Sequence, residues 1–181
     1  SVPEIHTIIL ELKLTYEKLV LFYLHRIKSI EFNKNQYLNS IISINQNIIN
    51  EAREKDKIKP KSIYSLHGIP VLLKDNINYE GLATTAGSFA LNNNISKNAF
   101  VVDKLRENGA LILGKTNLSE WAYYFCNNCP SGYSALGGQT LNPYGRKIFD
   151  SGGSSSGSGV AISANFSSVS LGSETSGSIL S

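Results

Sequence analysis

The sequence predicts an α/β fold, in which a mixed β-sheet core is covered by α-helices. Three observations lead to this expectation. The runs 67–77 and 110–116 contain the continuous Ile, Val and Leu residues of strands that are buried on both faces. The segment 98–109 between them has helical spacing and ends at Gly109, a residue suited to a helix C-terminus. Alternation of strands and helices is typical of a sheet with helices on its faces.

Residues 1–60 are expected to form an amino-terminal helical layer. Apolar residues recur at helical spacing over 7–31, and Thr15 is suited to cap the second of two helices there. Charged residues interrupt this apolar segment about once per turn, which argues against a membrane span. The isoleucine-rich run 41–44 indicates a short strand, and a helix is expected to begin after Asn47.

The rest of the chain continues the alternation. A helix is expected over 118–125, followed by a long loop rich in Gly and Asn over 130–150. The Gly-Ser tract 151–159 precedes an apolar segment, so we expect it to run into the N-terminus of a helix. A strand over 168–172 and a second Gly-Ser turn complete the pattern.

Composition excludes several classes of function. The net charge is +3, and no run of five or six like charges occurs, so the electrostatic footprint of a protein that binds nucleic acid or an anionic membrane is missing. A small-molecule or peptide substrate fits better. The two cysteines, Cys126 and Cys129, form a single CxxC without the partners of a zinc site, so we expect incidental cysteines and no metal. A reducing, cytoplasmic compartment agrees with so few cysteines.

Residues 109–116 spell GALILGKT, a literal match to the phosphate-binding P-loop. A phosphate cradle needs a flexible turn between strand and helix, whereas ALIL is itself an apolar strand. Lys115 is therefore expected to have a structural role. His67 comes just before the start of the first buried strand, and a structural hydrogen bond is expected for it rather than catalysis.

The Gly-Ser tract 151–159 has two interpretations. By composition it is a flexible linker. Together with the second Gly-Ser turn it can instead form two loops facing one pocket, where backbone N–H groups stabilise an oxyanion and serine hydroxyls supply the chemistry. Residues 153–157 also match the G-x-S-x-G nucleophile elbow, with Ser155 as nucleophile. That fold places its acid and histidine after the nucleophile, and all three histidines of this chain precede it.

Three motifs occur in order along the chain: GIPVLLKDNI with Lys74, GGSSSGSG with Ser154, and GSETSGSI with Ser178. Together they resemble the amidase-signature hydrolases. Ser154 and Ser178 are 24 positions apart, the spacing which that family shows between its bridging and nucleophilic serines. The segments GKTNLSEWA, GGQTLNPY and GSSSGSGVAISANF are most similar to its bacterial peptide amidase branch, which removes the carboxyl-terminal amide from peptides.

The resemblance implies an amidase that cleaves a linear carboxamide, either a peptide carboxyl-terminal amide or a similar small amide, through an acyl-enzyme and without a cofactor. Ser178 would be the nucleophile, Ser154 the bridging serine after a cis peptide bond, and Lys74 the base, which must be neutral to accept a proton. The oxyanion hole would consist of the backbone N–H groups of Thr175, Ser176, Gly177 and Ser178. Ser176 departs from the family pattern, in which a glycine is usual and peptide amidases carry an acidic residue.

The resemblance also implies that residues 61–181 are the first part of the amidase-signature catalytic core, incomplete at the carboxyl end. The fold is therefore expected in truncated form. Two alternatives remain open. One is the glutamine-hydrolysing subunit of a tRNA-dependent amidotransferase, which works in a complex. The other is an inactive, truncated amidase fragment.

Overall fold

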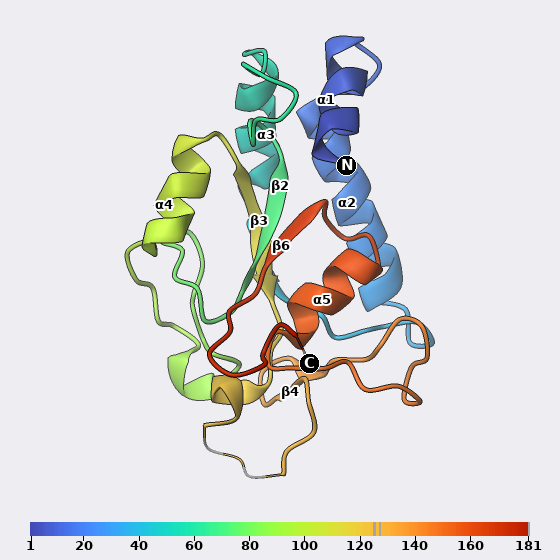
Figure 1. Ribbon diagram of the computed structural model, residues 1–181, viewed down its shortest axis with the longest axis vertical. Coiled ribbons are helices and arrows are strands. Elements are labelled where there is room, and N and C mark those ends of the chain that lie inside the picture. The colour runs from blue at the N-terminus through green and yellow to red at the C-terminus, as the bar shows by residue number, and fades with distance from the viewer. Residues whose placement is uncertain (125, 127, 181) are drawn as a thin grey trace.

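The computed structural model describes residues 1–180 except 125 and 127. Its centre is a four-stranded sheet in the order β1-β3-β2-β6, of which Figure 1 shows β3, β2 and β6 side by side. The strands are β1 (Ile41–Ile44), β2 (Pro70–Lys74), β3 (Leu111–Thr116) and β6 (Val169–Leu171). β1 is antiparallel to β3, whereas β2 is parallel to both β3 and β6. The predicted mixed sheet is thus confirmed, and β1, which lies within the predicted helical layer, belongs to it.

Helices surround this sheet. They are α1 (Val2–Leu10), α2 (Tyr16–Glu31), α3 (Ile48–Asp56), α4 (Phe100–Glu107) and α5 (Ser156–Ser163). Thr15 caps α2 as predicted, since its hydroxyl accepts a hydrogen bond from the Lys18 N–H at 3.1 Å. Asn47 precedes α3 as expected, but its side chain accepts from Asn50 rather than from the helix backbone. Among the described residues, no helix is both long and apolar enough to cross a membrane.

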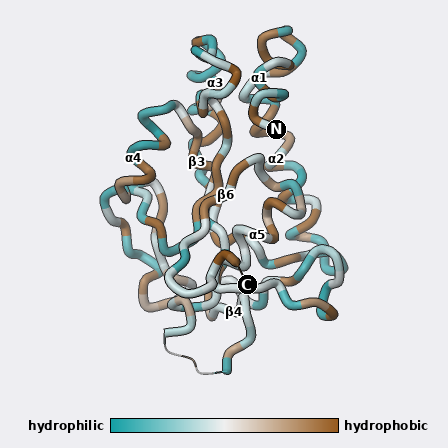
Figure 2. Tube along the Cα trace, viewed as in Figure 1, coloured by the Kyte–Doolittle hydropathy of each residue, from teal (hydrophilic) through white to brown (hydrophobic). Residues whose placement is uncertain are grey.

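The two central strands are buried on both faces. Leu72 packs with residues of α2, α3 and α5 on one face, while Val71 and Leu73 pack with Val102 of α4 on the other. Hydrophobic positions accordingly run along the central strands in Figure 2. This arrangement explains why β2 reads as a continuous apolar run rather than an alternating one.

α4 ends as the sequence predicts. Gly109 has a φ of +88°, and the N–H of Ala110 donates to the carbonyl of Leu105 at 3.0 Å. A side chain at position 109 would also meet the backbone of His67, since an added Cβ would lie 3.0 Å from its Cα. His67 itself forms the expected structural hydrogen bond, between its Nε2 and the Lys55 carbonyl at 3.0 Å.

The helix expected over 118–125 is wrong. Only a short 3₁₀ segment, η2 (Glu120–Tyr123), occurs there, and Trp121 and Ala122 within it have φ of 51° and 53°. Tertiary contacts fix the path of this segment, since the Ser119 N–H donates to the Ser154 carbonyl and the Trp121 N–H donates to the Ala86 carbonyl. The positive φ angles that the chain adopts over 121–123 are incompatible with a right-handed helix. Phe125 lies outside the described residues.

The loop expected over 130–150 carries a small hairpin, β4 (Tyr133–Ser134) with β5 (Gly138–Gln139). A second 3₁₀ segment, η1 (Phe89–Leu91), follows β2 along the chain. The Gly-Ser tract runs directly into α5, as predicted, and β6 lies within the expected strand over 168–172. The interpretation of the tract as a flexible linker is thereby excluded, because Ser154 and Ser156 are buried.

Candidate active site

The fold brings Lys74, Ser154 and Ser178 into one hydrogen-bonded chain. Lys74 is the last residue of β2, Ser154 lies in the turn before α5, and Ser178 lies in the loop after β6. Lys74 Nζ is 2.8 Å from Ser154 Oγ, and Ser154 Oγ is 3.0 Å from Ser178 Oγ. The Gly153–Ser154 peptide bond is cis, as the resemblance implies. Lys74 and Ser154 are 80 positions apart in sequence, and Ser154 and Ser178 are 24 apart, yet all three meet at the carboxyl end of β2.

The surroundings of Lys74 favour its neutral form. Its side chain is fully buried, and besides Ser154 it donates only to Ser155 Oγ at 3.0 Å and to the Ser173 carbonyl at 3.2 Å among the described residues. All three partners are uncharged. Burial lowers the pKa of Lys74 from 10.5 to about 8, because desolvation penalises the ammonium. A lysine with such a pKa can accept a proton near neutral to mildly alkaline pH.

Ser155 and Ser173 support the site; the sequence offered Ser155 only as the nucleophile of the rejected elbow interpretation, and it did not identify Ser173. Ser155 Oγ donates to the Ser173 carbonyl at 3.1 Å and lies 3.2 Å from the Ser173 N–H, in addition to its contact with Lys74. Three consecutive serines, 154–156, look alike in sequence, so nothing there distinguishes the second from the first. A nucleophile elbow requires a histidine beside its serine, whereas Ser155 is engaged with a lysine and a backbone loop.

The loop before Ser178 presents unused backbone donors. In the described part of the chain, no acceptor pairs with the N–H groups of Thr175, Ser176, Gly177 or Ser178. Glu174 braces this turn, since its carboxylate accepts from the Ile179 and Leu180 N–H groups at 2.8 and 3.1 Å. The Ser178 carbonyl accepts from the Ser155 N–H at 3.1 Å, which ties the loop to the start of α5. Gly177 has a φ of +95°, a backbone conformation suited to glycine.

A cleft of about 280 Å³ opens beside Ser178. Ser151, Gly153 and Ser155 line it from the Gly-Ser tract, and Ile162 lines it from α5. The hydroxyl of Ser178 therefore lies where a small molecule can approach.

Lys115 has a different environment. It is fully buried on β3, and its ammonium lies 3.0 Å from Asp75 Oδ1 and 2.9 Å from Thr84 Oγ1. Burial lowers its pKa, while the Asp75 carboxylate opposes this shift. Residues 111–116 are strand β3, so the P-loop interpretation fails, as expected from the sequence.

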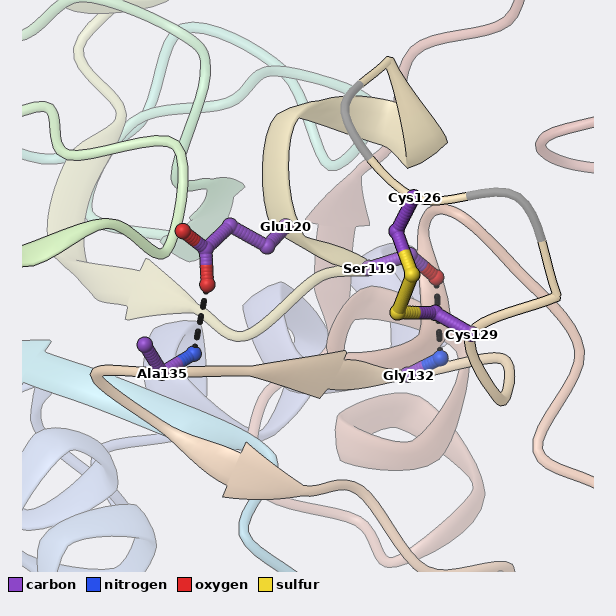
Figure 3. Close-up of a disulfide and its surroundings, with 6 residues drawn as sticks. All are labelled: Ser119, Glu120, Cys126, Cys129, Gly132 and Ala135. Atoms are coloured by element: carbon purple, nitrogen blue, oxygen red, sulfur yellow. Dashed lines mark hydrogen bonds between the residues drawn. A yellow bond between two sulfur atoms is a disulfide. The ribbon is translucent and has the colours of Figure 1, made fainter.

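The interpretation of the cysteines as incidental is wrong. Cys126 and Cys129 form a disulfide, with their Cα atoms 5.5 Å apart (Figure 3). Asn128, with a φ of 74°, turns the chain so that the two side chains meet. The cytoplasmic compartment stays a prediction, and the disulfide weighs against it. Among the described residues, no group of three or more His, Cys, Asp or Glu could hold a metal ion.

Comparison with known proteins gives one consistent result. The family model described as Amidase matches residues 18–181. A probable amidase of Arabidopsis thaliana is 44% identical over 187 residues, which cover 100% of this chain and 36% of that protein. A glutamyl-tRNA(Gln) amidotransferase subunit of Thermoanaerobacter pseudethanolicus is 42% identical over 160 residues, covering 87% of this chain and 31% of the subunit.

Solved structures agree. The native peptide amidase from Stenotrophomonas maltophilia superimposes with a TM-score of 0.93 at 43% identity, over 99% of this chain and 37% of that one. The chain thus spans about a third of the length of the curated relatives it matches.

Proposed function

Because the chain belongs to the amidase family, we propose that it carries the Ser-Ser-Lys site of an enzyme that hydrolyses a linear carboxamide through an acyl-enzyme. One observation carries this proposal: Lys74, Ser154 and Ser178 are linked by contacts of 2.8 and 3.0 Å. These are distances over which protons transfer directly.

In this mechanism neutral Lys74 is the ultimate base. Ser178 donates its hydroxyl proton to Ser154, and Ser154 donates its own to Lys74 Nζ. The Ser178 oxygen then attacks the carbonyl carbon of the amide. The protonated lysine returns the proton along the same path to the leaving amine, and water subsequently hydrolyses the ester. The lowered pKa of Lys74 keeps the required neutral form accessible.

The oxyanion of the tetrahedral intermediate would lie against the unused N–H groups of residues 175–178. Such preorganised donors act where negative charge develops, and losing one costs about 3 kcal/mol of transition-state stabilisation. Ser176 is compatible with this role, because a backbone N–H does not depend on the side chain. We assign the oxyanion hole to Thr175, Ser176, Gly177 and Ser178 as part of the proposal.

The preferred substrate is a peptide carboxyl-terminal amide or a similar small carboxamide. The likeness to the S. maltophilia peptide amidase, which covers 99% of this chain, supports this choice. A second candidate is glutamine hydrolysis within a tRNA-dependent amidotransferase. The 42% identity to the T. pseudethanolicus amidotransferase subunit favours it, and partner subunits would then be needed.

Labelling and turnover together test the proposal. The protein is treated with a fluorophosphonate probe, and ammonia release is measured from a blocked dipeptide amide and from L-glutamine in parallel. We expect one label per chain on Ser178, release from the peptide amide, and loss of both in Ser178→Ala.

Ser155→Ala is the matched control, since it removes a neighbouring hydroxyl from the same tract. Labelling that survives Ser178→Ala, or that disappears in Ser155→Ala alone, would refute the assigned nucleophile. Release from glutamine alone would favour the second candidate. Absence of both labelling and release would identify the chain as an inactive fragment.

A further inference from the structure

Residues 119–124, 126 and 128–133 are called here the clasp loop, and they include both cysteines of the disulfide. It packs against the turn that holds the bridging serine, since the Ser119 N–H donates to the Ser154 carbonyl at 3.1 Å. Ser119 Oγ accepts from the Gly132 N–H at 2.8 Å, so both arms of the loop meet at this side chain (Figure 3). Tyr123 and Ser119 also contact Gly153, where an added Cβ would lie 2.5 Å from the tyrosine oxygen and 2.7 Å from Ser119 Oγ.

Three neighbouring hollows lie between the candidate nucleophile and the disulfide. The cleft beside Ser178 shares Ser151 and Gly153 with a second hollow of about 550 Å³. That second hollow shares Tyr123 with a third of about 220 Å³ inside the clasp loop. The third hollow is lined by Ser119, Glu120, Tyr123, Cys126, Cys129 and Tyr133. The three hollows are therefore neighbours, and they lie beside any substrate that extends beyond an amide group at Ser178.

The chemistry of this surface selects a class of ligand. Two tyrosine rings and a disulfide form most of the third hollow, which suits an aromatic or aliphatic group. Among the described residues lining the three hollows, the charged ones are Glu120 and Asp150, both acidic. Each has one oxygen bound to a backbone N–H, of Ala135 and Gly152 respectively, at 2.7 Å. Neutral or cationic groups are thus favoured over anionic ones.

Several residues of the clasp loop have backbone conformations that are unfavourable without a restraint. Trp121, Ala122, Tyr123 and Asn128 have φ between 51° and 74°, a region that residues other than glycine seldom adopt. The disulfide joins cysteines only three positions apart, so it closes a short ring and restrains the unfolded chain little. Its principal effect is local, on the conformation of the loop that carries Tyr123.

We propose that the clasp loop is a substrate-binding wall, held in its binding conformation by the Cys126–Cys129 disulfide, which receives an aromatic or aliphatic, neutral or cationic group of the amide substrate. The proposal rests on the proposed function, since it assumes that the scissile amide lies at Ser178. A dithiol reductant would break the S–S bond, convert the cysteines to two thiols and itself become a disulfide. Extended substrates would then bind more weakly.

The test uses the Ser178→Ala variant, so that binding is measured without turnover. Benzyloxycarbonyl-glycinamide is the aromatic probe and acetamide is the small one. Each is titrated by calorimetry and by the fluorescence of Trp121, the single tryptophan of the chain, before and after reduction. We expect reduction to raise the Kd of the aromatic amide relative to that of acetamide about tenfold, the scale of discrimination by one apolar pocket.

The Cys126→Ser/Cys129→Ser double variant is the matched control. It should bind like the reduced protein and be insensitive to reductant, because the chain has two cysteines in total. Tyr133→Ala provides a second variant that keeps the disulfide. Its side chain is 44% exposed, so folding should tolerate the change, and the aromatic probe should again lose affinity.

An unchanged ratio of the two Kd values on reduction, or in Tyr133→Ala, would overturn the proposal. An equal loss of affinity for both probes would also overturn it, because the disulfide would then support the triad rather than the substrate-binding wall. If the Kd of the aromatic amide depends on the disulfide but the unmodified protein releases no ammonia, the proposed function is refuted and the substrate-binding wall is still supported.

Discussion

Two buried lysines on neighbouring strands show how partners, rather than burial, decide a role. Lys74 on β2 and Lys115 on β3 are both 0% exposed, and burial lowers the pKa of each. Lys115 faces the Asp75 carboxylate at 3.0 Å, which stabilises its charge. Lys74 has two hydroxyls and a carbonyl as partners. A buried lysine without a counter-charge can serve as a base, whereas one with a carboxylate partner is structural.

Asp75 makes this division possible. It follows Lys74 directly in the chain, yet its ion pair is with Lys115 on the adjacent strand. The second carboxylate oxygen of Asp75, Oδ2, accepts hydrogen bonds from Thr85. The Thr85 N–H donates to it at 3.2 Å, and the Thr85 hydroxyl donates to the same oxygen. The nearest carboxylate along the chain is therefore already paired, and Lys74 remains without an ion pair among the described residues.

The largest expected effect comes from removing the base. Lys74→Met should lower kcat by about 10²–10⁴-fold, the contribution of a positioned general base. The free energy of unfolding of this variant should not fall, because the substitution removes a buried, desolvated amine. Ammonia release and urea unfolding are measured on the same preparation. Ser154→Ala combined with Lys74→Met should cost little more than the worse single change, because the residues act as a unit. Appreciable activity in Lys74→Met would break the comparison.

The converse change affects stability first. Lys115→Met leaves the buried Asp75 carboxylate without its cationic partner, so the free energy of unfolding should fall by about 3–5 kcal/mol. Urea denaturation measures this loss. Asp75→Asn in the same chain should recover part of it, since the unpaired charge is gone. A loss below about 1 kcal/mol would mean that the ion pair with Asp75 does not distinguish Lys115 from Lys74.

The pH dependence sharpens the comparison further. The mechanism needs neutral Lys74, whose pKa is about 8, so kcat/KM should rise about tenfold per pH unit below this value and level off above it. The folded pKa lies below the ordinary value of 10.5, so between these values the unfolded chain binds more protons and stability should rise with pH. Lys74→Met should remove the part of that rise which Lys74 contributes, while the part due to Lys115, whose pKa burial also lowers, should remain.

Initial rates from about pH 6 to 10 measure the rise in kcat/KM. Urea unfolding, measured at the folded and at the unfolded pKa of Lys74, gives the rise in stability. A single limb near pH 6.5 that disappears in His67→Ala would instead identify a histidine base.

The smallest effect is expected at Ser155. Ser155→Ala removes one of three partners of Lys74 but leaves its contact with Ser154, so kcat should fall about tenfold, the scale of one hydrogen bond. Steady-state kinetics on the peptide amide measure it. Complete loss of activity would revive Ser155 as the nucleophile.

The sequence by itself determined the features that depend on neighbouring residues. The apolar run before Lys74 requires burial on both faces, Thr15 lies where a helix needs a side-chain acceptor, and Gly109 lies where the chain must adopt a positive φ. The resemblance of three motifs to the amidase-signature hydrolases named Lys74, Ser154 and Ser178 as candidates, and the fold brings them together.

Only the tertiary structure decided the rest. The predicted helix over 118–125 failed because the chain adopts positive φ angles over 121–123. This segment is held by the carbonyls of Ser154 and Ala86, which are distant in sequence. The ion pair of Asp75 with Lys115 required the pairing of β2 with β3. The same is true of the contact between Lys74 and Ser155, which are 81 positions apart. Local patterns constrain the backbone of a few consecutive residues, whereas these contacts depend on which strands and loops the folded chain places side by side.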